Sequence, residues 1–222
     1  MNPTPLGTEE VLAMVQDVVA RLVTPRFGRL GDGEVTSKRR PGDLVTVADR
    51  EAEVELTRLL RARQPGVLVV GEEAVHADPS LVRALPHAAH AFTLDPVDGT
   101  RRFVAGSPDH ATMLAELRRG EVVRSWIWQP QHGRAYVAER GAGAWRDGHR
   151  LSNGPRRPGL PRPTGTCCGV DYPRLASGEA DLAAYLKQKP WDHLPGGLLL
   201  AEAGGSVRRW GPLLVARSGR GD

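Results

Sequence analysis

Two short apolar segments of the sequence end in acidic residues. Residues 67–70 run into Gly71-Glu72-Glu73, and residues 91–94 run into Asp95-Pro96-Val97-Asp98-Gly99-Thr100. If both segments are strands, their ends deliver these carboxylates from a rigid sheet into one crevice. Converging acids repel one another unless a cation neutralises them, and a set of oxygen ligands favours a hard ion such as Mg²⁺. The pattern therefore predicts a Mg²⁺ site that contains Glu72, Asp95 and Asp98.

Gly99 and Thr100 close the second acidic segment. Free backbone N–H groups at the start of a helix or turn can bind phosphate, and a threonine hydroxyl beside them can position a water molecule. Metal ligands, an anion-binding turn and a hydroxyl in one short segment favour phosphoryl chemistry. Taken alone, the segment is as compatible with an ordinary polar turn, so other motifs have to distinguish the two interpretations.

The hydrophobic periodicity predicts a mixed α/β (α+β) protein in which helices and strands form layers. Thr8 can cap a helix whose apolar residues recur at helical spacing, which are Val11, Met14, Val18 and Leu22. Asp49 opens a second helix, which stops at Gln64-Pro65-Gly66. Residues 26–42 between the two helices are expected to form a loop or hairpin.

A region rich in strands follows the acidic segments. Residues 111–117 and 122–128 flank a turn, and Asp147-Gly148 marks a second tight turn. The proline-rich residues 152–166 indicate a loop or boundary. The remaining predicted elements are a strand at 135–139, a helix at 194–203 and closing strands at 207–210 and 213–216. On this pattern alone, Asp192 is most simply the cap of the last helix.

Length and composition limit the class of protein. The 222 residues can bury a sizeable core, and no apolar run approaches the roughly 18 residues that span a bilayer. The N-terminus has neither a basic start nor an apolar signal core, so we expect a cytoplasmic protein in which Cys167 and Cys168 are reduced. The net charge of +4 comes from scattered arginines. It suits anionic substrates and does not by itself favour nucleic acid.

Four segments, in order, resemble motifs of the inositol monophosphatase family. Asp43-Leu44-Val45-Thr46 with Asp49 resembles D-L-V-T-x-x-D, Gly71-Glu72-Glu73 resembles G-E-E, and residues 95–100 resemble D-P-[IVL]-D-G-T. Trp191-Asp192 followed by residues 202–205 resembles W-D-x-x-[AP]-G and E-A-G-G. The ordered set covers about three quarters of the chain and is very specific.

The resemblance implies a shortened α-β-α-β-α sandwich of the inositol monophosphatase/fructose-1,6-bisphosphatase type. We expect one domain over residues 1–222, with a metal-binding α+β part at about 1–150 and a smaller α/β part at about 151–222. Two features shorten it: residues 153–166 stand in place of a longer insertion, and the usual final helix is missing after 213–216. Arg102 stands where the family commonly has asparagine.

By position, the resemblance also implies site residues. The metal ligands are Glu72, Asp95, the carbonyl of Val97, Asp98 and Asp192. Thr100, backed by Asp49 and Glu72, activates the attacking water. The phosphate- and substrate-binding set is Gly99, Thr100, Asp98, Asp192, Tyr185 and Lys187. Supporting structural roles are expected for Glu73, Trp191 and His193.

The implied activity is Mg²⁺-dependent, lithium-sensitive hydrolysis of a small phosphate monoester by water, with two or three Mg²⁺ ions in the site. Inositol monophosphate is the leading substrate, and 3′-phosphoadenosine 5′-phosphate, fructose 1,6-bisphosphate and histidinol phosphate are alternatives. A non-catalytic metal- or RNA-binding regulator also stays open, because the frame is shortened and the sequence pI is about 9.5. A homodimer is expected, since relatives are usually dimers.

Overall fold

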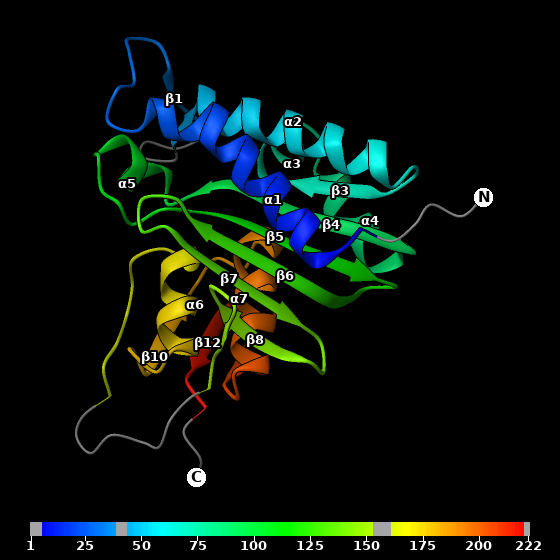
Figure 1. Cartoon of the computed structure of the whole chain (residues 1–222), viewed down its shortest axis with the longest axis vertical. Helices are drawn as coiled ribbons and strands as arrows, with labels where there is room; N and C mark the ends of the chain where they lie inside the picture. The colour runs from blue at the N-terminus through cyan, green and yellow to red at the C-terminus, as the bar shows by residue number, and fades with distance from the viewer. Residues whose placement is uncertain (1–5, 39–43, 153–160, 220–222) are drawn as a thin grey trace.

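A computed structural model describes residues 6–38, 44–152 and 161–219 as alternating layers of helix and sheet (Figure 1). The helices α1 (Thr8–Val18) and α2 (Val47–Arg63) pack on one face of a seven-stranded sheet. The helices α6 (Cys168–Ala176) and α7 (Pro190–Glu202) pack on its other face. A three-stranded sheet then packs against α6 and α7. The mixed α/β layering expected from the sequence is confirmed.

The seven-stranded sheet has the order β3-β4-β5-β6-β7-β8-β9. Its strands are β3 (Leu68–Gly71), β4 (His90–Asp98), β5 (Ala111–Arg118), β6 (Glu121–Gln129), β7 (Arg134–Glu139), β8 (Gly143–Arg146) and β9 (His149–Arg150). Only the pair β3–β4 is parallel among these strands of the described chain. Because parallel strands end at the same edge, Glu72 after β3 and Asp95 within β4 are brought to one place.

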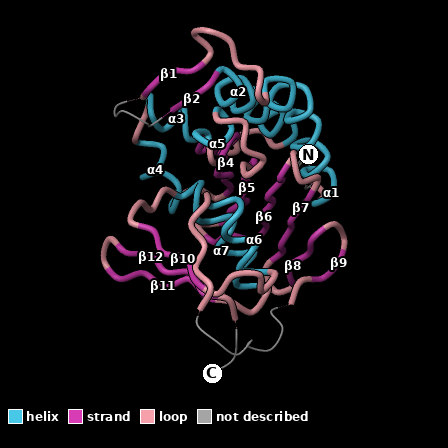
Figure 2. The backbone as a smooth tube through the Cα atoms, turned by 90° about the vertical axis from the view of Figure 1, so that its left-hand side faces the viewer, coloured by secondary structure: helices cyan, strands magenta, loops and turns pink. Residues whose placement is uncertain are grey.

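The smaller sheet has the order β10-β12-β11, with β10 (Leu182–Tyr185), β11 (Ser206–Trp210) and β12 (Leu213–Arg217). It lies at the end of the molecule remote from α2 (Figure 2). All five residues of β11 are exposed. The five layers expected from the resemblance are therefore represented by four, α-β-α-β, in the part of the chain that the structure describes.

Short elements complete the described chain. They are the hairpin strands β1 (Val35–Ser37) and β2 (Leu44–Thr46), the helices α3 (Glu72–Ala77), α4 (Ser80–Ala84) and α5 (Thr100–Val104), a π-helix over Val19–Val23, and 3-10 turns over Thr24–Arg26 and Leu85–His87. The hairpin β1–β2 agrees with the expectation for residues 26–42, of which 39–42 lie outside the described residues. No helix in the described ranges is both long enough and apolar enough to cross a bilayer.

Three predicted helix starts are wrong, each for a local reason. Gly7, not Thr8, is the N-cap of α1, because the Thr8 hydroxyl donates to Glu139 instead. Thr46 is the N-cap of α2, and Asp49 stands three residues later in a capping box. The final helix begins at Pro190 rather than at 194, so Asp192 lies in its first turn and is not its cap.

The apolar core has two parts, one on each face of the large sheet. The part under α1 and α2 includes Val15, Leu56 and Trp126, and the part under α6 and α7 includes Met113 and Leu199. The strand β4 is buried from Ala91 to Asp98, so its ladder position is fixed from both faces. The acids at its end are therefore held on a strand whose position is tightly constrained.

Candidate metal and phosphate site

A cavity of about 640 Å³ lies where β3 and β4 end and α5 and α7 begin. Acidic residues line it, together with basic residues from α5 and from the segment before α7. The lining residues are Leu44, Glu72, Asp95, Val97, Asp98, Gly99, Thr100, Arg101, Arg102, Ala105, Ser107, Thr166, Lys187, Lys189 and Asp192. Most of the residues that the sequence singled out thus share one cavity.

Three carboxylates meet in this cavity. Oxygen atoms of Glu72, Asp95 and Asp192 all lie within 4.8 Å of one another. Asp95 is 2 % exposed, and burial followed by the charges of its acidic neighbours raises its pKa well above the ordinary value. A carboxylate oxygen of Asp192 lies within 4.8 Å of one of Asp95, and burial raises the pKa of Asp192 to about 8. Such a contact between two carboxyls needs a shared proton or a bound cation.

Glu72 differs from its two neighbours because basic side chains reach it. Its Oε1 atom accepts hydrogen bonds from Lys38 Nζ at 2.9 Å and Lys189 Nζ at 2.7 Å, and its Oε2 accepts from Trp191 Nε1 at 3.2 Å. Burial alone would raise the pKa of Glu72, but Lys189 and Lys38 outweigh it and lower the pKa. Trp191 therefore does more than pack, and Glu73 also binds Lys38.

Lys38 and Lys189 are site residues that the sequence reasoning missed. Lys38 stands on the segment before the Asp43 motif, and Lys189 stands two residues before Trp191. Their proximity to recognised motifs is the only signal that the sequence offers. Sequence separation hides the connection, because the two lysines that share one carboxylate oxygen are 151 positions apart.

Asp98 lines the cavity but has a second partner. Its Oδ2 atom accepts a hydrogen bond of 2.6 Å from the Gly169 amide at the start of α6. Burial raises the pKa of Asp98 to about 6, against the opposing effect of that hydrogen bond. A Cβ on Gly169 would overlap Ala111 and stand 3.1 Å from this oxygen, so the close approach needs glycine.

The Thr100 hydroxyl lies between two acceptors, Asp49 Oδ1 at 3.1 Å and the Val97 carbonyl oxygen at 3.0 Å. Asp49 is buried in the first turn of α2, where its other oxygen accepts from the Thr46 amide and hydroxyl. Burial raises the pKa of Asp49 to about 6 in spite of these bonds. A hydroxyl that donates to a carboxylate keeps its lone pairs for a water molecule in the cavity.

Gly99 joins β4 to α5 in the left-handed conformation, with φ at 85°. The Arg102 and Phe103 amides make the first backbone bonds of α5 to the Gly99 carbonyl. The Gly99 and Thr100 amides precede this turn, and both residues line the cavity together with the acids. Arg102 lines the cavity, and its Nε donates to the Thr166 carbonyl at 3.2 Å.

Tyr185 and Lys187, two members of the expected substrate-binding set, are placed differently. Lys187 lines the cavity. Tyr185 is not among the described lining residues, because its hydroxyl donates to Asp171 at 3.1 Å and its ring stacks on Tyr172. His193 lies under this pair, with Nε2 donating to the Lys187 carbonyl at 2.7 Å. Tyr185 and His193 thus support the segment that carries Lys187.

The donor set fits a hard divalent cation. The three carboxylates offer oxygen atoms only, and the close approach of Asp95 and Asp192 is a place that a cation would occupy in exchange for a proton. The residues that would hold such ions are Glu72, Asp95, Val97 through its carbonyl, Asp98 and Asp192. With such ions bound, the arrangement could neutralise a phosphate group beside the Thr100 hydroxyl.

Sequence comparison identifies relatives of the chain. An inositol-1-monophosphatase of Rhizobium meliloti is 34 % identical over 131 residues, which are 59 % of this chain and 47 % of the relative. A putative Nus factor SuhB of Neisseria meningitidis is 25 % identical over 214 residues, covering 79 % of this chain and 77 % of the relative. The chain spans about half the length of the first inositol-1-monophosphatases it matches.

Solved structures share the fold. A Thermotoga maritima IMPase superposes with a TM-score of 0.82 at 21 % identity, covering 95 % of this chain and 91 % of the other. An IMPase/NADP phosphatase solved with Mg²⁺ and phosphate gives a TM-score of 0.74 at 20 % identity, over 93 % of this chain and 87 % of the other. The sequence model of the inositol monophosphatase family, a family of phosphoric monoester hydrolases, matches residues 8–166. The chain belongs to this family.

Proposed function

We propose that the chain hydrolyses a small phosphate monoester in a Mg²⁺-dependent reaction, with water as the nucleophile. The observation that carries this proposal is the meeting of Glu72, Asp95 and Asp192 in a cavity that is also lined by Thr100, whose hydroxyl donates to Asp49. The carboxylates alone would repel a phosphate. Together with bound cations they become an anion-binding site, which is the reason for linking the acids to phosphate chemistry.

The acids supply the ligands, and the set named above suits two or three Mg²⁺ ions. When bound, Mg²⁺ neutralises phosphate charge and lowers the pKa of a coordinated water. Lys38 and Lys189 keep Glu72 ionised, and their ammonium groups occupy the Oε1 atom for which a cation would compete. Asp98 is aimed by the Gly169 amide, which fixes one oxygen and leaves the other toward the cavity.

Thr100 and Asp49 accept the proton of the attacking water, Thr100 through a hydrogen bond and Asp49 as the base behind it. The Thr100 oxygen accepts a hydrogen bond from that water while its own hydrogen is directed at Asp49 or at the Val97 carbonyl. The raised pKa of Asp49, about 6, makes it a stronger base than an exposed aspartate. Gly99 holds the turn that presents the Gly99 and Thr100 amides to the phosphate.

Basic residues around the acids favour an anionic substrate and bear on its identity. Arg101, Arg102, Lys187 and Lys189 all line the cavity. Inositol monophosphate is the leading substrate, because the curated relatives at 34 % and 33 % identity carry the name inositol-1-monophosphatase. One structural neighbour is named a dual specific IMPase/NADP phosphatase, so a nucleotide phosphate belongs among the compounds to be tried.

A panel of phosphate esters tests the proposal. Phosphate release is measured with inositol 1-phosphate, fructose 1,6-bisphosphate, 3′-phosphoadenosine 5′-phosphate, NADP and histidinol phosphate. We expect release that needs Mg²⁺, stops with chelator and is inhibited by lithium. Phosphate release that continues in chelator would contradict the metal site. If none of the esters released phosphate, the proposed activity would be contradicted.

A second candidate, RNA binding by a regulator, is favoured by one exposed strand. The edge strand β11 presents Val207, Arg208, Arg209 and Trp210 to solvent, with Trp210 52 % exposed. Arginine beside an exposed aromatic can bind single-stranded nucleic acid through charge and stacking. Gel-shift titration with a single-stranded RNA at physiological salt tests this, with Trp210→Ala as the variant. Unchanged RNA binding in this variant would show that β11 is not the RNA-binding strand.

A further inference from the structure

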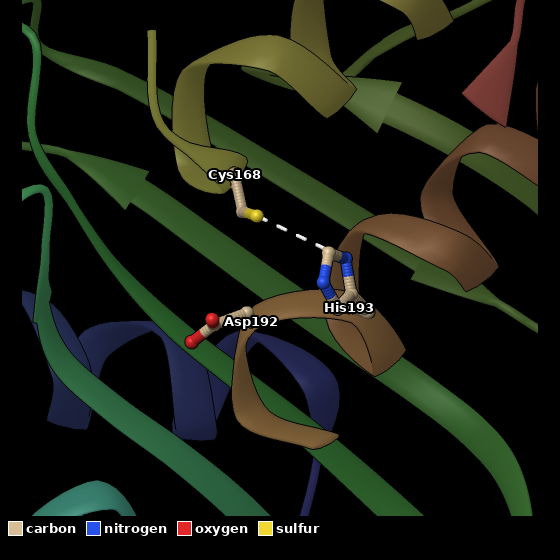
Figure 3. A group of neighbouring side chains, drawn as sticks. All are labelled: Cys168, Asp192 and His193. Carbon is tan, nitrogen blue, oxygen red and sulfur yellow. Dashed lines mark hydrogen bonds between the residues drawn. The ribbon is translucent and has the colours of Figure 1, made fainter. Parts of the chain in front are cut away.

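We propose a second metal site, selective for a thiophilic ion such as Zn²⁺, formed by Cys168, His193 and Asp192. Cys168 stands at the start of α6, and the other two residues stand in the first turn of α7 (Figure 3). One ligand atom from each, the thiol sulfur, a ring nitrogen and a carboxylate oxygen, lie within 4.8 Å of one another. The site shares Asp192 with the carboxylate cluster and adds two ligands that the proposed Mg²⁺ chemistry does not use.

The Cys168–His193 pair already has nearly the spacing of a metal site. Cys168 Sγ lies 3.8 Å from His193 Nδ1. A tetrahedral Zn²⁺ with bonds of about 2.3 Å to sulfur and 2.0 Å to nitrogen holds such atoms about 3.5 Å apart. Closing the set onto one ion therefore needs side-chain movements of about an ångström, mainly by Asp192. Both Cys168 and His193 are 7 % exposed and are held by packing.

The second nitrogen of His193 is prepared for such a role. Its Nε2–H donates to the Lys187 carbonyl at 2.7 Å, which fixes the tautomer and leaves the Nδ1 lone pair toward Cys168. A backbone carbonyl that binds the far ring nitrogen is the usual support of a metal-ligating histidine. The Tyr172 hydroxyl, 3.0 Å from Nδ1, donates to that lone pair and competes with an ion for it.

The chemistry of the three ligands separates this site from the Mg²⁺ site. Sulfur and imidazole select borderline ions such as Zn²⁺, whereas Glu72 and Asp95 offer only oxygen. Burial raises the pKa of the Cys168 thiol, so a divalent ion has to displace its proton on binding. Because both sites need Asp192, Zn²⁺ is expected to withdraw that ligand from Mg²⁺ and inhibit turnover. This last consequence rests on the proposed function, and the binding itself does not.

Cobalt(II) binding tests the site directly. The chelator-treated full chain is titrated with Co²⁺ while the near-ultraviolet thiolate-to-cobalt charge-transfer band is followed, and Zn²⁺ is then added to displace it. We expect a saturable band from one ion per chain, lost on adding Zn²⁺. Co²⁺ binding without a charge-transfer band, which oxygen ligands alone would give, overturns the proposal.

The neighbouring cysteine provides a matched control. Cys167 Sγ faces the Asp98 and Asp109 carbonyls, at 4.0 and 3.6 Å, rather than His193. Cys168→Ala and His193→Gln are expected to weaken Zn²⁺ binding by about 100-fold or more, while Cys167→Ala leaves the band intact. Tyr172→Phe removes the competing hydroxyl and is expected to tighten binding severalfold. A band that survives in Cys168→Ala, or vanishes in Cys167→Ala, contradicts the assignment.

Phosphatase assays separate this inference from the proposed function. With saturating Mg²⁺, the Zn²⁺ concentration that halves turnover is expected to rise about 100-fold in Cys168→Ala relative to Cys167→Ala. A charge-transfer band in a chain that hydrolyses no phosphate ester supports the Zn²⁺ site and contradicts the proposed function. Turnover in a chain without the band supports the proposed function and contradicts the Zn²⁺ site.

Discussion

The Thr100 hydroxyl lies 3.1 Å from the buried carboxylate of Asp49, although 51 positions separate the two residues in the sequence. Thr100 stands at the start of α5 and Asp49 in the capping box of α2, so the hydrogen bond joins the first turns of these two helices. Asp49 serves both as part of a helix terminus and as an acceptor for the hydroxyl. Several consequences of the site's geometry can be measured.

The Thr100–Asp49 pair predicts a defect in turnover. Thr100→Ala removes the acceptor of the water proton, so kcat is expected to fall by about 10²- to 10⁴-fold while KM changes little. Thr100→Ser keeps the hydroxyl and should retain most of the activity. In the double variant with Asp49→Asn, the two losses should be less than additive because the residues act together. A rise in KM with unchanged kcat would argue against this role.

Asp95 is expected to be indispensable for both metal binding and turnover. Asp95→Asn removes one charge from the carboxylate cluster and should abolish turnover together with the Mg²⁺-induced rise in Tm. At about 100 times its Kd, a bound ligand stabilises the native state by about 2.7 kcal/mol, so the missing rise is measurable by calorimetry. Asp32→Asn, at an exposed position, is the control. Equal Mg²⁺ shifts in the two variants would eliminate Asp95 as a ligand.

Lys189 and Lys187 line the same cavity but should affect different quantities. Lys189→Met removes one of the ammonium groups on Glu72, so we expect tighter Mg²⁺ binding by severalfold and a loss of about 1 kcal/mol of stability in chelator. Lys187 makes no ion pair with Glu72, and Lys187→Met should raise KM without changing Mg²⁺ affinity. Isothermal titration with Mg²⁺ distinguishes the variants, and weaker Mg²⁺ binding in Lys189→Met would be the contrary result.

The metal-free protein should lose stability as the pH rises. The folded pKa values of Asp49 and Asp98, about 6, and of Asp192, about 8, lie above the ordinary 3.8, so the folded state binds more protons than the unfolded state. Their contribution is present below about pH 4 and is lost as the pH rises through 6 to 8. The pKa of Glu72 is lowered, so its contribution to stability changes in the opposite direction and is lost as the pH falls.

Thermal unfolding in chelator at pH values between about 5 and 8 measures this dependence. Tm is expected to fall across the range, and saturating Mg²⁺ should raise Tm more at the upper end, because the ions replace the protons. Choline chloride at matched ionic strength controls for general screening. A Tm that is independent of pH in chelator would mean that the cluster does not hold protons in the folded state.

Two adjacent glycines of α7 make a matched test of packing. A Cβ on Gly196 would overlap the Tyr172 ring, so Gly196→Ala is expected to lower the free energy of unfolding by about 2–3 kcal/mol. A Cβ on Gly197 would meet only Val207 Cγ2, at 4.0 Å, and Gly197→Ala should stabilise the helix by about 0.5–1 kcal/mol. Urea denaturation measures the free energy of unfolding of both variants. Equal values would show that α7 can move away from the Tyr172 ring of α6 without a loss of stability.

The sequence by itself determined the strands and the local acid motif. Residues 91–94 and 111–117 are apolar runs bounded by turn signals, and the structure places β4 and β5 there. Asp95, Val97 and Asp98 share one segment, so local geometry already carries part of their relation. These features depend on neighbours in the chain, which periodicity and turn chemistry can predict.

Only the tertiary structure decided which distant groups meet. Lys38, Lys189 and Trp191 converge on Glu72 because the end of β3, the hairpin β1–β2 and the start of α7 surround one cavity. Tyr185, expected at the substrate, instead binds Asp171, and Cys168 meets His193 where α6 crosses α7. Local sequence cannot predict these contacts, because they depend on side-chain packing between elements far apart in the chain. The sequence motifs thus identify the acidic residues, whereas the fold decides which basic residues lie beside them and balance their charge.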